Sequence, residues 1–321
     1  MYYIGVDLGG TSIKAGLVSK DCEIIQTLTA PTIADNPDKI LKDIASLSLD
    51  LIKNQNLSLA DISSIGVGST GLIDSKNKTI VTCNNIKFSN TNFETELKKN
   101  INYDLPIYLE NDANCATVAE FFSGSLKGHS NCIMLTVGTG VGGGVIVGGS
   151  LLKGSILGET ELGHMIVDPS GDACTCGQTG CLETFCSATA IIKHAKKIIN
   201  ADSNISTKIL ELASGDINNI NGANIFDAYD LGDEVAKQVI DRFNNYMAYG
   251  IINLYNIFKP SIVCIGGGAS ARKTKLTNPI QELVQKQIYC SGERELYKVT
   301  PAVLGNSAGI IGASMLANMQ S

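Results

Sequence analysis

Apolar residues follow two spacings along the chain, and these predict an alternation of strands and helices. Short apolar runs bounded by turn residues predict strands over residues 4–8, 62–68, 131–137 and 262–265. Apolar residues three or four positions apart predict helices, most clearly over residues 232–258, where Val239, Phe243 and Met247 lie on one stripe. Further helices are expected over residues 40–52, 113–126, 187–199, 205–213, 222–230 and about 306–319. This alternation is typical of an α/β fold.

The pattern at the start of the chain occurs again near its middle. The strand over residues 4–8 is followed by a glycine turn and by a strand over residues 13–18. Residues 131–147 predict the same order, with the glycine turn at residues 138–144. Such a repeat predicts two related lobes, each with a hairpin that can face a phosphate.

The length of the chain leads to the same expectation. A chain of 321 residues suits two lobes with a cleft between them better than a single core. We expect a smaller N-terminal lobe of residues 1–118 plus about 305–321. Residues 119–304 would form a larger C-terminal lobe that contains a cysteine-rich loop.

Glycine turns follow three of the predicted strands. They are Asp7-Leu8-Gly9-Gly10-Thr11, Thr136-Val137-Gly138-Thr139-Gly140 and Ile265-Gly266-Gly267-Gly268. Glycine lets backbone amides approach a polyanion and threonine adds a hydroxyl donor, although a single hairpin can use glycine for steric reasons alone. Three such turns, two of them with threonine, indicate phosphate binding.

Two common phosphate-binding folds do not fit these turns. Gly138, Gly140 and Gly143 match G-x-G-x-x-G, but that motif needs a following helix, whereas Val145-Ile146-Val147 predicts a strand. The sequence also contains no G-x-x-x-x-G-K-[ST] motif. Strand–turn–strand phosphate loops in two lobes indicate instead the actin-like ATPase architecture, which is ribonuclease H-like.

The composition excludes several classes of protein. Hydrophobic residues make up 44% and charged residues 17%, which favours a buried core over disorder. The formal net charge of −6 argues against a nucleic-acid-binding surface but allows a nucleotide. There is no apolar run of about eighteen residues, and the first residues lack the features of a signal peptide. We therefore expect a cytoplasmic protein with small-molecule partners, no nucleic acid and no membrane.

Most of the ten cysteines are scattered, but a few gather in one segment. Cys115, Cys132 and Cys264 have apolar or small neighbours and are expected to act as small hydrophobic residues. The gathered ones are Cys174, Cys176, Cys181 and, less closely, Cys186. With His164, the first three form a Cys₃His set that suits a closed, structural zinc site. The C-x-C spacing is tighter than usual, so a disulfide or inert thiols remain alternatives.

Five motifs together resemble one known family, the ROK family of repressors, open reading frames and kinases. They are Asp7-Leu8-Gly9-Gly10-Thr11, Glu110-Asn111-Asp112-Ala113-Asn114, residues 135–144, Gly158-Glu159-Thr160-Glu161-Leu162-Gly163-His164 and Cys174-Thr175-Cys176-Gly177-Gln178-Thr179-Gly180-Cys181-Leu182-Glu183. The resemblance extends from residue 2 to about residue 317 and is strongest to bacterial sugar kinases of the family. The family's repressors carry a helix-turn-helix before the first strand, and this chain begins at that strand. Two positions depart from the family, Thr70 where proline is common and Phe88 where tryptophan is frequent.

The resemblance implies a sugar site. Asp112 would be the general base that orients a sugar hydroxyl and accepts its proton. Without the resemblance, Asn111 or Asp112 could equally cap the following helix. The residues that would bind the sugar are Gly68, Asn111, Asp112, Glu161, His164 and Glu183. Glutamate suits vicinal hydroxyls because two oxygens can accept two hydrogen bonds, although glutamate is more often plain surface charge.

The resemblance also implies an ATP site. Its contacts in one lobe would be Gly9, Gly10 and Thr11, and in the other Thr136, Gly138, Thr139 and Gly140, with Gly267 and Gly268 near the adenosine or α-phosphate. Asp7 would hold Mg²⁺ through water, because Mg²⁺ keeps much of its hydration. Lys14 would offset phosphate charge, or lie solvated on its strand.

The expected reaction is ATP-dependent phosphorylation of glucose at its 6-hydroxyl. Other kinases of the family act on N-acetylmannosamine, N-acetylglucosamine, fructose or allose, and these sugars are the alternatives. A non-catalytic sugar sensor on the same fold is the alternative from another class. A homodimer or homotetramer is expected from the family alone.

Overall fold

The computed structural model describes residues 1–83, 85–154, 160–202, 204–289 and 292–319. Gly158 and Glu159 of the family motifs, and Cys290, one of the ten cysteines, lie outside the described residues. The chain divides into two compact units. The first contains Met1–Cys132, Gly144–Thr160 and Val303–Ser321, and the second contains Ile133–Gly143 and Glu161–Ala302. The lobe boundaries predicted from the sequence stay predictions.

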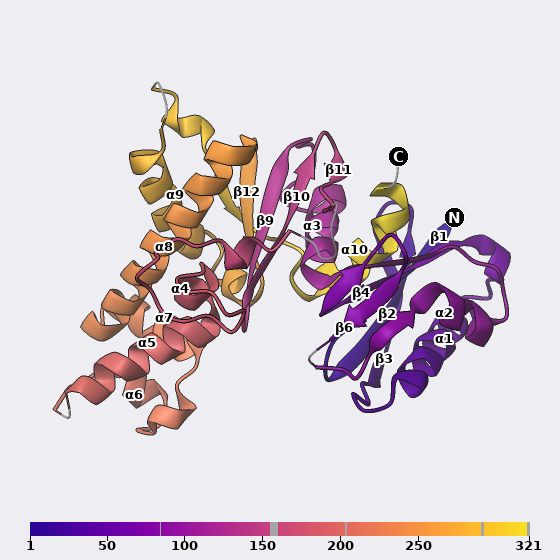
Figure 1. The fold of residues 1–321 in the computed structure, drawn as a ribbon, viewed down its shortest axis with the longest axis horizontal. Coiled ribbons are helices and arrows are strands. Elements are labelled where there is room, and N and C mark those ends of the chain that lie inside the picture. The colour runs from indigo at the N-terminus through magenta and orange to yellow at the C-terminus, as the bar shows by residue number, and fades with distance from the viewer. Residues whose placement is uncertain (84, 155–159, 203, 290–291, 320–321) are drawn as a thin grey trace. The chain divides into compact units, whose positions relative to one another are not determined.

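The first unit is built on a five-stranded sheet in the order β3-β2-β1-β4-β8 (Figure 1). Its strands are β1 (Tyr2–Leu8), β2 (Ser12–Ser19), β3 (Ile24–Pro31), β4 (Ile62–Ser69) and β8 (Ile107–Asn111). The first three pair antiparallel as two hairpins, whereas β4 lies parallel to both β1 and β8. Three parallel strands therefore end at one edge of the sheet. A small separate sheet contains β5 (Leu72–Asp74), β6 (Thr79–Thr82) and β7 (Ser89–Asn92).

Among the described residues, four helices accompany this sheet in the first unit: α1 (Pro37–Asn54), α2 (Phe93–Ile101), α3 (Asp112–Ser123) and α10 (Ala308–Met315). Helix α1 begins where the Asn36 side chain accepts a hydrogen bond from the amide of Lys39, and Ile40, Ile44 and Leu51 lie fully buried in the core. Helix α10 packs against β1, β4 and α3. The C-terminal helix therefore belongs with the N-terminal strands.

A second five-stranded sheet has the order β11-β10-β9-β12-β13. Its strands are β9 (Cys132–Val137), β10 (Val141–Val147), β11 (Ser150–Leu151), β12 (Ile262–Gly266) and β13 (Val299–Pro301). Both sheets thus contain three chain-consecutive strands in reverse order, followed by a parallel pair. This confirms the repeat that the sequence predicted. Because β10 follows the second glycine turn as a strand, the dinucleotide-binding motif is excluded here.

The second unit is rich in helices. They are α4 (Glu183–Cys186), α5 (Ala188–Ala201), α6 (Lys208–Leu212), α7 (Gly222–Asp230), α8 (Glu234–Phe258) and α9 (Thr274–Gln287). The long predicted helix is confirmed as α8, which ends at Lys259 in a left-handed conformation before Pro260. The sequence analysis missed α9, which contains Pro279. Its buried residues Leu276, Ile280 and Val284 carry the helical spacing that would have revealed it.

Short 3₁₀ helices complete the described chain, at Leu59–Asp61, Leu162–His164, Ile217–Asn219, Gly268–Arg272, Arg294–Leu296, Gly305–Ser307 and Leu316–Met319. Among the described residues, no helix is both long enough and apolar enough to span a bilayer.

Candidate active site and metal cluster

The carboxyl ends of three parallel strands bring the predicted site residues of the first unit to one edge of its sheet. Asp7 on β1 lies beside Gly68 on β4, and Gly68 lies beside Glu110 on β8. The first glycine turn follows β1 directly, and Asp112 follows β8. Ligands of parallel α/β sheets bind outside the carboxyl ends of the strands. The fold therefore places Asp7, Gly68 and Asp112, which the sequence analysis singled out, where such a site is expected.

Asn111 and Asp112 begin helix α3. The Oδ1 atom of Asn111 accepts hydrogen bonds from the amides of Ala113 at 2.8 Å and Asn114 at 3.3 Å, so the capping role of Asn111 is confirmed. Asp112 is exposed, and its Oδ1 accepts a hydrogen bond from the amide of Ala113 at 2.8 Å. Because Asp112 is exposed and directly follows β8, its carboxylate is accessible to a substrate at this edge of the sheet. The catalytic role stays a prediction.

Glu110, which the sequence analysis did not single out, supports this corner from within. Its side chain is only 1% exposed. Oε1 accepts hydrogen bonds from the amide of Asn111 at 2.9 Å and from Nδ2 of Asn114 at 3.1 Å, and Oε2 lies 3.4 Å from Nζ of Lys153. A charged residue at the end of an apolar strand was the signal that could have indicated it. The ion pair offsets the cost of burying this charge.

Asp7 lies opposite Lys14 in the antiparallel pair of β1 and β2. Burial raises the pKa of the Asp7 carboxyl above its ordinary value, and the nearby Lys14 ammonium partly opposes that rise. Gly309 of α10 packs close by, since a Cβ atom there would lie 2.8 Å from Cγ of Asp7. A divalent cation would favour the ionised carboxylate, so Asp7 fits the predicted role in binding Mg²⁺.

The two departures from the family lie in the first unit. Thr70 follows β4, and its Oγ1 lies 3.5 Å from Sγ of Cys83. Phe88 is buried and packs on Phe93 with ring centroids 5.1 Å apart. Phe88 is therefore part of the core of this unit.

In the second unit, two of the predicted phosphate turns meet. The amide of Gly138 donates to the carbonyl of Gly140 at 2.9 Å and closes the turn after β9. Gly267, after β12, has a φ of +79°, and a Cβ atom there would lie 2.3 Å from the carbonyl oxygen of Val137. Only glycine fits this position, so a steric requirement explains the glycine at position 267 without any contact to phosphate. A Cβ atom on Gly138 or Gly268 would meet nothing within 4 Å, which leaves space beside both.

Glu183 joins the second turn to the cysteine loop. Its Oε2 accepts a hydrogen bond from the amide of Val141 at 2.9 Å, and its Oε1 lies 3.9 Å from Sγ of Cys174. A Cβ atom on Gly140 would lie 2.3 Å from Oε2 of Glu183. The predicted sugar ligand and the predicted ATP turn are therefore in direct contact within one unit.

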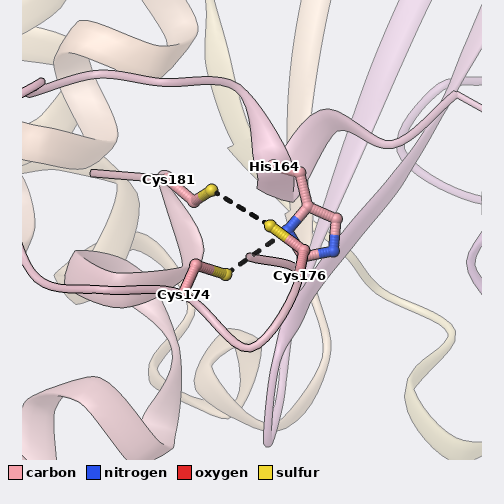
Figure 2. A group of neighbouring side chains, drawn as sticks. All are labelled: His164, Cys174, Cys176 and Cys181. Atoms are coloured by element: carbon pink, nitrogen blue, oxygen red, sulfur yellow. Dashed lines mark hydrogen bonds between the residues drawn. The ribbon is translucent and has the colours of Figure 1, made fainter. Parts of the chain in front are cut away.

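His164, Cys174, Cys176 and Cys181 form one cluster, and Figure 2 shows their side chains converging. The four candidate ligand atoms lie within 4.8 Å of one another. Sγ of Cys174 is 3.6 Å from Nδ1 of His164, and the sulfurs of Cys176 and Cys181 are 3.7 Å apart. A tetrahedral zinc ion would separate two sulfurs by about 3.8 Å and a sulfur from a nitrogen by about 3.6 Å. The cluster is compatible with structural zinc.

The backbone around the cluster is tightly turned. Isolated bridges join Ile166 to Cys181 and Ala173 to Thr179. Gly177 and Gly180 adopt φ values of +93° and +78°, which favour glycine and permit sharp turns in this loop.

The thiols of the cluster differ in acidity. A hydrogen bond from the Gln178 amide lowers the pKa of Cys176, whereas burial raises the pKa of Cys181 to about 12. No disulfide bond joins any of the cysteines that the structure describes, so the disulfide alternative is not realised. Cys115, Cys132 and Cys264 are buried in the core as predicted.

The remaining predicted sugar ligand, Glu161, is exposed and directly precedes the 3₁₀ helix that carries His164. Its carbonyl accepts a hydrogen bond from the His164 amide at 3.1 Å. Glu161 and Glu183 therefore lie at the two ends of the segment that contains the metal cluster.

Comparison with known proteins gives consistent matches along the chain. The model of the ROK family matches residues 3–320. The glucokinase of Streptomyces coelicolor is 33% identical over 314 residues, which cover 98% of this chain and 96% of that protein. The glucokinase of Thermotoga maritima is 35% identical over 315 residues, again 98% of this chain and 96% of that protein.

A solved structure shows the same likeness in three dimensions. A ROK family glucokinase from Streptomyces griseus, in complex with glucose and AMPPNP, is 31% identical with a TM-score of 0.81, covering 98% of this chain and 99% of that chain. The predicted α/β fold, that of the two-lobed actin-like ATPases, is confirmed by this match.

Proposed function

The chain belongs to the ROK family, and from that premise we propose that it transfers the γ-phosphoryl group of ATP to the 6-hydroxyl of D-glucose. Both relatives named above are glucokinases, and the Streptomyces griseus structure holds glucose and AMPPNP. One observation in this chain carries the proposal. At the carboxyl edge of the first sheet, an exposed Asp112 begins a helix in the corner that also holds Gly68 and the first glycine turn.

Asp112 acts as the general base in this proposal. Its carboxylate accepts the proton of the sugar 6-hydroxyl while that oxygen bonds to the γ-phosphorus and the bond from phosphorus to ADP breaks. Asn111 uses Oδ1 in its cap, so its Nδ2 is the group that it would offer to a sugar hydroxyl. Gly68, Glu161, Glu183 and His164 complete the proposed sugar contacts, and Nε2 of His164 faces away from the cysteine that Nδ1 contacts.

The glycine turns bind ATP in this proposal. Backbone amides near Gly9, Gly10 and Thr11 and near Thr136, Gly138, Thr139 and Gly140 contact phosphate oxygens, and Gly267 and Gly268 lie beside the adenosine or α-phosphate. Asp7 holds Mg²⁺, which neutralises charge on the transferred group when bound. Lys14, paired in register with Asp7, adds positive charge on the neighbouring strand.

The Cys₃His cluster holds a structural zinc ion in this proposal. Four protein ligands leave no open position for a water nucleophile, so the ion stabilises the loop and does no chemistry. Its effect on the reaction passes through Glu183, which lies beside Cys174. The cytoplasmic location and the homodimer or homotetramer expected from the family are proposed with this function.

A coupled assay of ADP release tests the substrate. We expect D-glucose to give the highest kcat/KM in a panel with N-acetylmannosamine, N-acetylglucosamine, fructose and allose. Asp112→Asn should lower kcat by about 10²–10⁴-fold while glucose binding, measured by calorimetry, survives. Asp38→Asn, which changes a carboxylate in the first turn of α1 in the same unit, is the matched control and should retain full activity.

Each alternative has its own outcome in this assay. A higher kcat/KM on another sugar would reassign the substrate within the family. Sugar binding without turnover on any member of the panel would favour a sensor. Normal turnover by Asp112→Asn would remove the general base from the mechanism.

A further inference from the structure

The first glycine turn is held by a threonine that lies outside it. Thr32 follows β3, and its hydroxyl donates to the carbonyl of Gly9 at 2.7 Å. The amide of Thr32 donates to the carbonyl of Thr11 at 3.0 Å. Two carbonyls of the turn are therefore fixed by one residue.

The second glycine turn is held in the same way from a different element. The amide of Ala188, the first residue of α5, donates to the carbonyl of Gly138 at 2.8 Å. The hydroxyl of Thr189 donates to the carbonyl of Thr139, also at 2.8 Å. Again two carbonyls of the turn are fixed, and again one bond comes from a threonine hydroxyl.

Fixing these carbonyls sets the direction of the neighbouring amides. A trans peptide unit is planar, with its carbonyl and its N–H pointing in opposite directions, and the described chain has no cis bonds. Holding the Gly9 carbonyl thus turns the Gly10 amide away from Thr32. Holding the carbonyls of Gly138 and Thr139 likewise directs the amides of Thr139 and Gly140 away from α5.

We propose that Thr32 and Thr189 are positioning residues that orient the amides of the two glycine turns toward the phosphates of ATP. A carbonyl oxygen that pointed toward a phosphate would repel it. Each hydrogen bond therefore keeps the carbonyl oxygen turned away from the phosphate and leaves the N–H group of the same peptide unit pointing toward it. This inference rests on the proposed function, because it assumes that the turns bind ATP. The two threonines do not occupy corresponding places in the repeated strand order, so the arrangement arises separately in each unit.

The test is the affinity of the full-length protein for Mg²⁺–AMPPNP, measured by titration calorimetry. Thr32→Val should weaken binding about tenfold and Thr189→Val about threefold, since valine keeps the shape and removes one hydrogen bond. The effect at Thr189 is smaller because that residue is exposed, whereas Thr32 is half-buried. Glucose affinity and kcat at saturating ATP should stay within about twofold of the unchanged protein.

Three comparisons distinguish positioning from simple loss of stability. Thr32→Ser and Thr189→Ser restore the hydroxyl and should recover AMPPNP affinity. Thr29→Val, at an exposed position of β3, should change nothing. The melting temperature of the valine variants should fall by no more than about 3 °C.

Several results would overturn the proposal. These are an unchanged AMPPNP affinity in both valine variants, a parallel loss of glucose and AMPPNP affinity, or serine variants that fail to recover. If the unchanged protein binds no nucleotide at all, the proposed function fails first, and this inference fails with it.

Discussion

The two glycine turns occupy corresponding places in two similar sheets, yet the chain supports them by different means. Beside the first turn, Asp7 packs against Gly309 of the C-terminal helix, and the helix lies on β1 and β4. Beside the second turn, Gly140 and Val141 pack against Glu183, which contacts the metal cluster. The repeated strand order therefore determines where a turn lies but not what holds it in place.

The difference follows from what each unit can bury. The first turn is backed by a core that contains Ile4, Val6 and Leu8 of β1, all essentially fully buried. The segment beside the second turn, from His164 to Glu183, has little regular structure and few apolar residues. Such a loop cannot order itself by apolar burial alone, and the proposed zinc ion would supply the missing cross-link. The first turn should thus resist metal removal and the second should not.

Among the predicted changes, loss of the metal should produce the largest difference between the two glycine turns. Cys176 is exposed, so Cys176→Ser leaves no cavity and removes only a ligand. We expect loss of zinc, a melting temperature lower by roughly 5–10 °C, and strongly reduced activity. In hydrogen exchange, amides of residues 136–145 and 164–183 should exchange faster, while those of residues 5–15 should not change.

Metal analysis of the purified protein accompanies this measurement. Cys22→Ser, which changes a half-buried thiol of the first unit, is the matched control and should keep zinc and stability. Equal acceleration of exchange in both turns would contradict the contrast. Fully active, fully stable protein without zinc would remove the structural role of the cluster.

A smaller effect is expected when only the contact between Glu183 and the second turn is changed. In Gly140→Ala the new methyl would lie 2.3 Å from Oε2 of Glu183, so the carboxylate must move and lose its bond to the Val141 amide. We expect kcat/KM to fall about tenfold for both glucose and ATP, with zinc content and melting temperature nearly unchanged.

The matched control for this change is Gly222→Ala in the same unit, where the new methyl would meet only Cδ1 of Ile191 at 3.9 Å. Its activity should equal that of the unchanged protein. If Gly140→Ala affected ATP alone, Glu183 would have no role in sugar binding. Zinc loss in that variant would mean that the contact supports the cluster and not the reverse.

The sequence predicted the main strands and most helices because their apolar spacing is regular, and it predicted the metal cluster because cysteine and histidine are chemically distinctive. It missed α9, whose apolar spacing is regular but which contains Pro279, a residue that usually ends or kinks a helix. It also missed Glu110, Thr32 and Thr189, because their roles depend on which backbone groups the fold brings within 3 Å or so of them. No spacing in the chain shows that Thr189 will meet the carbonyl of Thr139.

The smallest expected change in the stability of the nucleotide-free protein concerns the carboxylate of Asp7, beside the first turn. The Asp7 carboxylate, unlike that of Glu183, accepts no hydrogen bond from the residues that the structure describes, and burial raises its pKa. The folded protein therefore keeps this proton to a higher pH than the unfolded chain, whose aspartate pKa is about 3.9. Its contribution to the free energy of unfolding thus decreases as the pH rises from that value through the folded pKa, and stays low at pH 7. Asp7→Asn should raise the melting temperature of the nucleotide-free protein by about 2 °C at pH 7 and by less at pH 4, and it should abolish the further rise given by Mg²⁺–ATP.

Asp61→Asn is the control with the opposite sign. The hydroxyl and the amide of Ser58 lower the pKa of Asp61, so this change should slightly destabilise the same unit at pH 7. A melting temperature of Asp7→Asn below that of the unchanged protein at pH 7 would mean that Lys14 already satisfies the carboxylate, and that the first turn needs no cation to complete it.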